Sequence, residues 1–288
     1  MKIGISSYSF HTLVDSGEMK QIDVIAKAKE IGFDVIEFSD FHLEDGETPV
    51  SFAPKIKAEA ARVGIEVGNY TIGADFLNHP GGPLGQAEAL KEQVKAAKLM
   101  GAPGMRHDVM YRFPEAPYTQ SYDAVLPQLA EGCRAVTEYA ASMGIRTMVE
   151  NHGYIAQDSA RVEKLMNAVA HPNFGWLVDI GNFACADEES VKAVGVAARY
   201  AFHVHVKDFH IKSGMLLDPG RGWFRTRGGN YLRGAIVGHG DIPVLQCLGI
   251  LARAGYDGTV SLEFEGMEDP LTAIEIGCEN MKRFVSML

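Results

Sequence analysis

The sequence has few cysteines, no long apolar run and no excess of positive charge. Its 288 residues contain four cysteines, and none of them belongs to a Cys-x-x-Cys pair. This spacing argues against a disulfide framework and a zinc knuckle, and it fits a reducing compartment. The formal net charge of -10 disfavours the phosphate backbone of a nucleic acid as a partner.

Membrane segments and domain linkers are also missing. No apolar run reaches membrane-spanning length, and no signal-like segment precedes the first predicted strand, so we expect a cytoplasmic protein. No stretch rich in Pro, Gly and Ser divides the chain. A hydrophobic fraction of 47% is sufficient for one large core. Together these features predict one domain over residues 1–288.

One pattern recurs along the chain: a helix-like run ends in Ala-x-x-x-Gly, and a hydrophobic strand follows at once. It occurs at 28–32, 60–64, 97–101 and 140–144, and again at Gly255 with leucine in place of the alanine. Glycine just beyond a helix supplies the left-handed conformation that turns the chain directly into a strand. Such units predict parallel strands joined by helices. Eight units of roughly 36 residues predict an α/β fold, the (β/α)8 TIM barrel.

The predicted strands and helices alternate along the chain with one exception. Strands are predicted to begin near Lys2, Phe33, Glu66, Gly104, Ile145, Gly175, Ala201 and Thr259. Helices are predicted at about 19–31, 52–63, 86–100, 121–143, 159–170, 188–198, 243–254 and 270–286. The connection 209–242 is long, rich in Gly and Arg, and has no predicted helix. After a barrel strand, such a connection is expected on the active-site face.

Ionisable side chains gather at the predicted ends of the last four strands. The four segments are Glu150-Asn-His152, Asp179-Ile-Gly-Asn182, His203-Val-His205-Val-Lys207 and Ser261-Leu-Glu263-Phe-Glu265. Alternate residues of a strand share a face, so His203, His205 and Lys207 are predicted to point toward the barrel axis. Several carboxylates around one axis repel each other unless a cation lies among them.

Three carboxylates and one imidazole therefore predict a divalent metal site, formed by Glu150, Asp179, His205 and Glu263. Oxygen-rich ligands with one nitrogen suit Mn²⁺ well, and Mg²⁺, Co²⁺ and Zn²⁺ are alternatives. Any one of these carboxylates alone is more simply a surface group, but four ionisable groups at equivalent strand ends favour the joint site. His203 is predicted to be a packed histidine of the barrel interior.

These segments, together with Gly238-His-Gly240-Asp, resemble the xylose isomerase-like TIM barrels over essentially the whole chain. That superfamily includes sugar isomerases and epimerases, among them ketose 3-epimerases, and also hydroxypyruvate isomerase and inosose dehydratases. The resemblance implies a divalent metal held by the same four residues. It also implies that Glu150 and Glu263 exchange a proton with a carbon next to a carbonyl. Ketose 3-epimerases have a histidine where this chain has Asn182, and an arginine soon after the histidine equivalent to His205.

Loss of a proton beside a carbonyl creates an enediolate, whose charge a metal ion stabilises. Carboxylates on opposite sides of the enediolate plane can remove the proton and return it. Return to the opposite face gives epimerisation, return to the neighbouring carbon gives isomerisation, and loss of a leaving group gives elimination. We therefore predict a metal-dependent isomerase or epimerase of a sugar, sugar phosphate or polyol. The alternative is a lyase at the same site, either a keto-inositol dehydratase or an enzyme that cleaves 3-oxo-glycosides.

Several neighbouring residues have two interpretations each. His152 is either a second catalytic acid or base, or a partner that orients Glu150. Lys207 either holds a substrate oxygen or pairs with Glu265. Glu37, at the end of the second strand, either contacts substrate hydroxyls or forms a structural ion pair.

The remaining candidates for substrate contact lie on the fourth strand, after the sixth strand and in the long connection. Either Arg106 or His107 is expected to face the pocket, and Asn182 is a further candidate. Arg227 and the neighbouring arginines form either an anion site or a solvated or intersubunit loop, and we favour the loop.

Two other functional classes remain open. An AP-endonuclease-like enzyme shares this barrel but needs several zinc ions and a basic groove, which the charge of -10 disfavours. A noncatalytic sugar-binding barrel would keep the fold without turnover. We expect a small sugar or polyol as the partner, no nucleic acid and no membrane. We also expect a homo-oligomer, a dimer or a tetramer, with a different protein partner left open.

Overall fold

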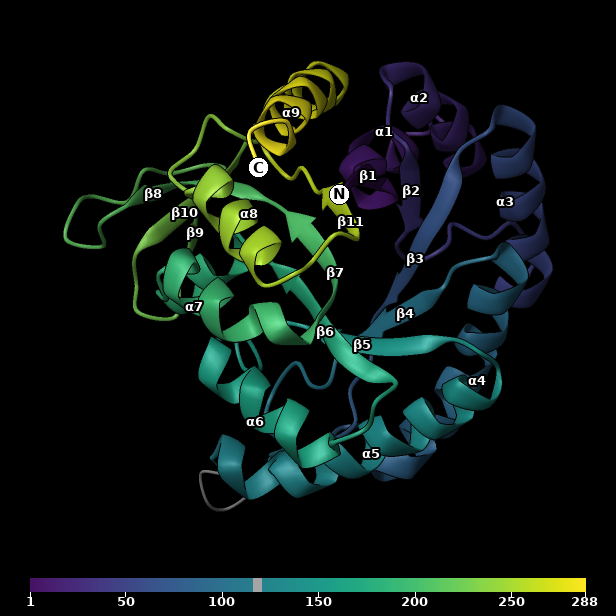
Figure 1. Ribbon diagram of the computed structural model, residues 1–288. Coiled ribbons are helices and arrows are strands. Elements are labelled where there is room, and N and C mark those ends of the chain that lie inside the picture. The colour runs from purple at the N-terminus through teal and green to yellow at the C-terminus, as the bar shows by residue number, and fades with distance from the viewer. Residues whose placement is uncertain (116–120) are drawn as a thin grey trace.

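Eight parallel strands close into a barrel at the centre of the molecule (Figure 1). The computed structural model describes residues 1–115 and 121–288. The strands are β1 (Lys2–Ser6), β2 (Val35–Phe38), β3 (Glu66–Ile72), β4 (Gly104–His107), β5 (Arg146–Glu150), β6 (Phe174–Asp179), β7 (Ala201–Val206) and β11 (Thr259–Leu262). Their order around the barrel follows the chain, and β11 pairs with both β7 and β1. The predicted TIM barrel of one domain is confirmed.

Helices surround the barrel and return the chain from each strand to the next (Figure 1). The α-helices are α1 (His11–Asp15), α2 (Val24–Ile31), α3 (Pro49–Val63), α4 (Gly82–Met100), α5 (Tyr122–Ser142), α6 (Ser159–Val169), α7 (Ser190–Ala197), α8 (Val244–Arg253) and α9 (Pro270–Val285). Short 3-10 helices are η1 (Ser7–Phe10), η2 (Gln21–Asp23), η3 (Asn182–Ala186) and η4 (Ala198–Tyr200). None of the helices described in residues 1–115 and 121–288 is both long and apolar enough to cross a bilayer.

The glycines of the recurring pattern end three of these helices as predicted. Gly32, Gly64 and Gly101 cap α2, α3 and α4 in the left-handed conformation, with φ values of 103°, 73° and 88°. Each cap is followed within a few residues by the next strand, so the connections on this face of the barrel are short. The opposite face carries the longer connections that follow the strand ends.

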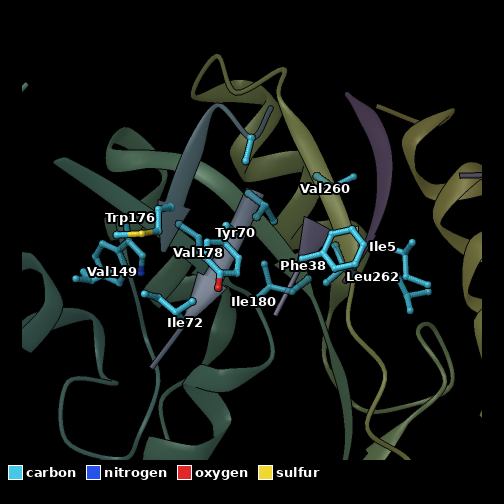
Figure 2. Close-up of a cluster of buried hydrophobic side chains, with 14 of the residues drawn as sticks. Ile5, Phe38, Tyr70, Ile72, Val149, Trp176, Val178, Ile180, Val260 and Leu262 are labelled. Atoms are coloured by element: carbon cyan, nitrogen blue, oxygen red, sulfur yellow. The ribbon is translucent and has the colours of Figure 1, made fainter. Parts of the chain in front are cut away.

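The two sides of the barrel wall differ in polarity. Buried side chains that face the helices are mostly apolar. Figure 2 labels ten residues of a buried hydrophobic cluster: Ile5, Phe38, Tyr70, Ile72, Val149, Trp176, Val178, Ile180, Val260 and Leu262. The alternate positions on the same strands face the axis and include buried ionisable residues such as Glu37, His203 and His205. Burial of apolar surface against the helices therefore stabilises the fold, while the barrel interior is polar and available for chemistry.

The long connection after β7 has regular structure that the sequence did not predict. It forms a three-stranded antiparallel sheet in the order β8-β10-β9, from β8 (Asp208–Lys212), β9 (Phe224–Arg225) and β10 (Tyr231–Ala235). Asp208 secures its base, because its carboxylate accepts hydrogen bonds from the backbone N–H groups of Phe209, Gly238, Gly240 and Ile242. Short strands interrupted by glycines give little periodic signal, which explains why this sheet was missed.

Candidate functional site

A polar pocket of about 280 Å³ lies at the carboxyl ends of the barrel strands. Its lining comes from seven of the eight strands or the segments that follow them: Tyr8, Ser39, Asp40, Thr71, Ile72, Gly73, Arg106, Asp108, Tyr111, Glu150, His152, Lys207, Glu263 and Glu265. The volume is close to the ~300 Å³ lower limit of small-molecule sites, which suits a ligand of monosaccharide size.

The four predicted metal ligands meet beneath this pocket. Glu150, Asp179, His205 and Glu263 each offer one ligand atom, and these atoms all lie within 4.8 Å of one another. They come from β5, β6, β7 and the residue directly after β11, so four neighbouring strand ends bring them together. All four side chains are buried, and Asp179 and His205 are fully inaccessible to solvent.

The turn after β6 sets the orientation of Asp179. Its Oδ1 accepts hydrogen bonds from the backbone N–H groups of Gly181 at 2.8 Å and Asn182 at 3.0 Å. Asn151 links this strand end to β5, donating from Nδ2 to the Asp179 carbonyl at 2.8 Å. A side chain at position 181 would clash with the Lys207 carbonyl at 2.6 Å, so glycine is required there. Oδ2 of Asp179 is left directed at the cluster without a hydrogen-bond partner.

Both oxygens of Glu150 have a partner: one accepts a hydrogen bond and the other forms an ion pair. Oε1 accepts a hydrogen bond from Asn182 Nδ2 at 2.9 Å, and Oε2 pairs with Arg106 Nε at 2.9 Å. Arg106 also donates from Nη2 to Asp108 Oδ1 at 2.6 Å. These contacts hold the Glu150 carboxylate in one orientation at the floor of the pocket.

Lys207 lies among the acidic groups on the opposite side of the cluster. Its Nζ is 2.8 Å from Glu263 Oε2, 3.4 Å from Asp179 Oδ2 and 3.5 Å from Glu265 Oε2. Burial alone would raise the pKa of Glu263, but Lys207 and His205 outweigh it and hold that pKa well below its ordinary value. For Asp179 the burial effect prevails over Lys207 and raises the pKa.

The cluster fits a divalent cation by two independent criteria. First, Asp179 Oδ2 and His205 Nδ1 are buried atoms that make no hydrogen bond within residues 1–115 and 121–288, and their charged neighbours Lys207 and Glu263 lie at 3.4 and 3.5 Å. Secondly, carboxyl groups outnumber permanent cations in the described part of the chain, because Glu150, Asp179, Glu263, Glu265 and Asp108 lie around Arg106 and Lys207. Three carboxylates and one imidazole can therefore hold an oxygen-preferring metal ion.

A second ionisable pair lies at the rim of the pocket. His152 Nδ1 is 2.9 Å from Asp108 Oδ1, and 42% of the His152 side chain is exposed to solvent. Burial lowers the pKa of His152, but the neighbouring Asp108 carboxylate outweighs it and raises that pKa. Asp108 also accepts a hydrogen bond from the Tyr111 hydroxyl at 3.0 Å. This pair can present a proton to a ligand in the pocket.

Two residues predicted as substrate contacts, His107 and Glu37, point to positions outside the pocket. His107 points away from the axis and packs against Phe76 and Phe174, where burial lowers its pKa to about 4. Glu37 faces the axis but lies below the pocket, fully buried against His203 and His205. Neither residue lines the described pocket, Arg106 is the member of the Arg106/His107 pair that does, and Glu37 pairs with the two histidines.

Two further predicted contacts are engaged by the protein itself. Asn182 does not line the pocket: its Nδ2 donates to Glu150 Oε1, its Oδ1 accepts from Lys207 Nζ at 3.4 Å, and its backbone carbonyl accepts from Gln157. Arg227 pairs with Asp158 at 2.7 Å and donates to the Tyr154 carbonyl, so it attaches the long connection to the segment after β5. Neither side chain lines the pocket, so substrate contact by Asn182 and Arg227 stays a prediction.

Several lining residues were not predicted from the sequence. Asp108 lies two residues after Arg106, so the same alternation rule identifies it as axis-facing once the end of β4 is known. Asp40, Tyr8 and Tyr111 lie on connections after the strands, where no periodic pattern marks the direction of a side chain. Arg106 and Lys207, by contrast, do line the pocket.

Comparisons with known proteins agree with this architecture. The family model described as "Xylose isomerase-like TIM barrel" matches residues 25–284, and no curated protein matches the sequence. Solved structures with the same fold include an IolI protein with a bound zinc atom (TM-score 0.75, 16% identity, covering 100% of this chain and 99% of that one).

Two further structures have named activities. One is the probable 3-DHS dehydratase AsbF from Bacillus anthracis (TM-score 0.74, 16% identity, coverage 98% and 99%). The other is an L-ribulose 3-epimerase (TM-score 0.71, 16% identity, coverage 99% and 97%). At these identities the likeness shows the fold, while the family model covers most of the sequence. This chain belongs to the xylose isomerase-like TIM barrel family.

Proposed function

We propose that this protein is a divalent-metal-dependent isomerase or epimerase of an uncharged sugar or polyol. The observation that carries the proposal is the convergence of ligand atoms of Glu150, Asp179, His205 and Glu263 within 4.8 Å, two of which make no hydrogen bond within the described residues. Structures of the same fold with a zinc atom and with 3-epimerase activity support the class of reaction. A bound divalent ion would orient the substrate oxygens and stabilise the negative charge that develops after proton loss.

Glu150 and Glu263 are the proposed groups that exchange the substrate proton. Both line the pocket, and they come from different sectors of the barrel, β5 and the end of β11. Each is paired with a separate cation, Arg106 for Glu150 and Lys207 for Glu263. Whichever of the two is ionised can accept the proton from carbon and return it to the neighbouring carbon, which gives isomerisation. For epimerisation the other must carry a proton beforehand, so that it can donate this proton to the opposite face.

The charge of the pocket favours an uncharged substrate over a phosphorylated one. Within the described part of the chain, Arg106 and Lys207 are the permanent cations of the lining, and both are buried in ion pairs with carboxylates. Asp40 and Glu265 add further negative charge at the pocket. A phosphate group would meet carboxylates without a free Arg or Lys to bind it, whereas sugar hydroxyls can donate hydrogen bonds to them.

The His152–Asp108 pair favours a lyase as the second candidate. Elimination requires an acid that protonates the leaving group, and His152 lies in the pocket lining with Asp108 positioned 2.9 Å from its ring. A keto-inositol dehydratase or an enzyme that cleaves 3-oxo-glycosides would use this acid together with the same carboxylates. The dehydratase with the same fold supports this alternative.

Incubation with a panel of ketoses, aldoses and keto-inositols in deuterium oxide tests the proposal. The protein is first stripped of metal and then loaded separately with Mn²⁺, Mg²⁺, Co²⁺ or Zn²⁺. An isomerase or epimerase introduces one deuterium into a product that is otherwise of unchanged composition, and this is detected by mass spectrometry and NMR.

The products separate the two candidates. Release of water or of an aglycone from the keto-inositols or 3-oxo-glycosides would assign the lyase instead. Turnover by metal-free protein at the rate of the loaded protein would contradict both, because both require the metal site. Preference for a sugar phosphate over the free sugar would contradict the assignment of an uncharged substrate.

A further inference from the structure

A buried carboxylate lies one layer deeper in the barrel than the proposed metal site. Glu37 on β2 has no exposed surface, and it contacts the two histidines of β7 from across the barrel. Its Oε1 contacts His205 Nε2, and its Oε2 contacts His203 Nε2. The Ser261 hydroxyl on β11 donates to the same Oε2 at 3.3 Å. Donors from two strands therefore hold both oxygens of this carboxylate.

We propose that Glu37 is a positioning residue that directs Nδ1 of His205 toward the metal ion; this inference rests on the proposed metal site. A carboxylate oxygen only accepts hydrogen bonds, so the contact requires a hydrogen on His205 Nε2. The lone pair of a neutral imidazole is then on Nδ1.

The surroundings of Nδ1 agree with this assignment. Nδ1 is buried and makes no hydrogen bond to any residue that the structure describes; it lies 3.5 Å from Glu263 Oε2 and 3.8 Å from Glu150 Oε1. It therefore faces the other proposed ligands with the atom that a cation requires. Histidines that bind metals commonly donate their second N–H to a carboxylate, which fixes the ring and its tautomer.

The geometry gives Glu37 a role that a simple ion pair of the barrel core would not need. His203, its other partner, also contacts the Ser261 hydroxyl, at 3.2 Å, so this histidine secures the carboxylate from the side away from the metal site. His205, in contrast, has one nitrogen on Glu37 and the other on the metal cluster. Glu37 thus lets side chains deeper in the barrel set the orientation of His205, the proposed metal ligand.

The variant Glu37→Gln tests this role with little change of shape. A glutamine offers one acceptor and one N–H₂ donor, so it cannot accept hydrogen bonds from both Nε2 atoms through two oxygens. We expect a 10- to 100-fold weaker affinity for Mn²⁺, the loss typical when a partner of a metal ligand is removed. The affinity is measured by titration of Mn²⁺ into metal-free protein, with free Mn²⁺ followed by electron paramagnetic resonance.

A matched control separates positioning from general destabilisation. Thr137 is also fully buried, and its hydroxyl contacts Thr147 Oγ1 at 2.7 Å on the helix side of the barrel wall. Thr137→Val removes a buried polar group without touching the cluster, and its Mn²⁺ affinity should stay within twofold of the parent protein. An equal loss in both variants would overturn the positioning role.

The tautomer of His205 supplies a readout that does not depend on a variant of Glu37 folding. In Zn²⁺-loaded protein labelled with ¹⁵N-histidine, Nε2 of His205 should carry the hydrogen and Nδ1 should be the metal-bound nitrogen, assigned by the signals lost in His205→Ala. An Nδ1–H tautomer would overturn the inference.

The failure of this inference is distinguishable from failure of the proposed function. If His205→Ala and Glu150→Gln retain the parent's Mn²⁺ affinity, the metal site itself is wrong. If those two variants lose Mn²⁺ while Glu37→Gln keeps it, only the role of Glu37 is overturned.

Discussion

Two buried clusters share His205, and both bring three or more metal-ligand side chains together. The upper cluster holds Glu150, Asp179 and Glu263 with His205, and the lower one holds Glu37 and His203 with His205. Proximity alone does not distinguish them. Hydrogen bonds do, since among the described residues Asp179 Oδ2 and His205 Nδ1 of the upper cluster make none, whereas both oxygens of Glu37 are engaged.

The balance of charge also marks the upper cluster, and not the lower one, as the metal site. The lower cluster has one carboxylate against two imidazoles, and although burial raises the pKa of Glu37, those imidazoles hold it at about 2. The upper cluster has three carboxylates, and its excess negative charge is only partly offset by Lys207. The comparison teaches that a metal site is recognised by ligand atoms that lack hydrogen-bond partners and by carboxylates in excess of cations. It also indicates that the lower cluster serves the upper one.

The largest expected effect is on proton transfer in the upper cluster. Replacing Glu150 or Glu263 by glutamine should lower turnover by about 10²- to 10⁴-fold, the usual contribution of a catalytic acid or base. Deuterium incorporation per bound metal ion measures this, with metal content determined for each variant because both residues are also proposed ligands. Turnover close to that of the parent in a metal-loaded Glu150→Gln variant would show that Glu150 is not the base.

The next largest effect is on Mn²⁺ affinity, which should differ between variants of His205 and His203. His205→Ala removes a ligand and should weaken Mn²⁺ binding by more than 100-fold, beyond the 10- to 100-fold typical for a partner of a ligand. His203→Ala removes only one donor to Glu37 and should cost about tenfold or less. Titration of metal-free protein with Mn²⁺ gives both values. Equal losses in the two variants would mean that the clusters act as one site.

His107 tests whether the pKa of a buried histidine depends on its burial or on charged neighbours. His107 is as buried as His205 but faces aromatic rings, and burial lowers its pKa from 6.5 to about 4. Since the unfolded chain binds this proton more tightly, folding stability falls as pH drops from 6.5 to 4. The loss amounts to about 3 kcal/mol at the lower pH.

Urea unfolding at pH 7, 5 and 4 measures this loss. His107→Gln should flatten the decline in the free energy of unfolding between pH 7 and pH 4 relative to the parent protein. Parallel declines in parent and variant would assign the acid sensitivity to other groups.

The smallest effect is expected far from both clusters. Arg227 pairs with Asp158 at a partly exposed position, and such pairs contribute about 0.2–1 kcal/mol. Arg227→Met should lower the free energy of unfolding by that amount and leave kcat/KM unchanged within about threefold. A loss of kcat/KM for a phosphorylated substrate alone would instead restore the anion site at this arginine.

Much of the upper cluster could be predicted from sequence because strands obey a rule of alternation. His205, Glu263 and Glu150 lie at predicted strand ends with the correct parity, and the barrel brings those ends to one axis. The same rule could not choose between Arg106 and His107 without the register of β4, which directs Arg106 into the pocket and His107 outward.

The roles of polar side chains could not be predicted in the same way. Asn182, Arg227 and Glu37 have residue types suited to substrate binding, but each is occupied by a protein partner from a distant part of the sequence. Whether a polar group is free for a ligand depends on such partners, and sequence spacing does not reveal them.

The sequence by itself determined the barrel and the four acidic or imidazole side chains at its strand ends, since the glycine-capped helices and the alternation of strands are local properties. The tertiary structure decided which atoms are left without partners. The directions of Asp179 Oδ2 and His205 Nδ1 depend on Gly181, Asn182 and Glu37. Glu37 comes from the far side of the barrel, 168 residues away from His205 in the chain. Closure of the barrel puts such residues in contact, and only that closure creates the geometry a cation can use.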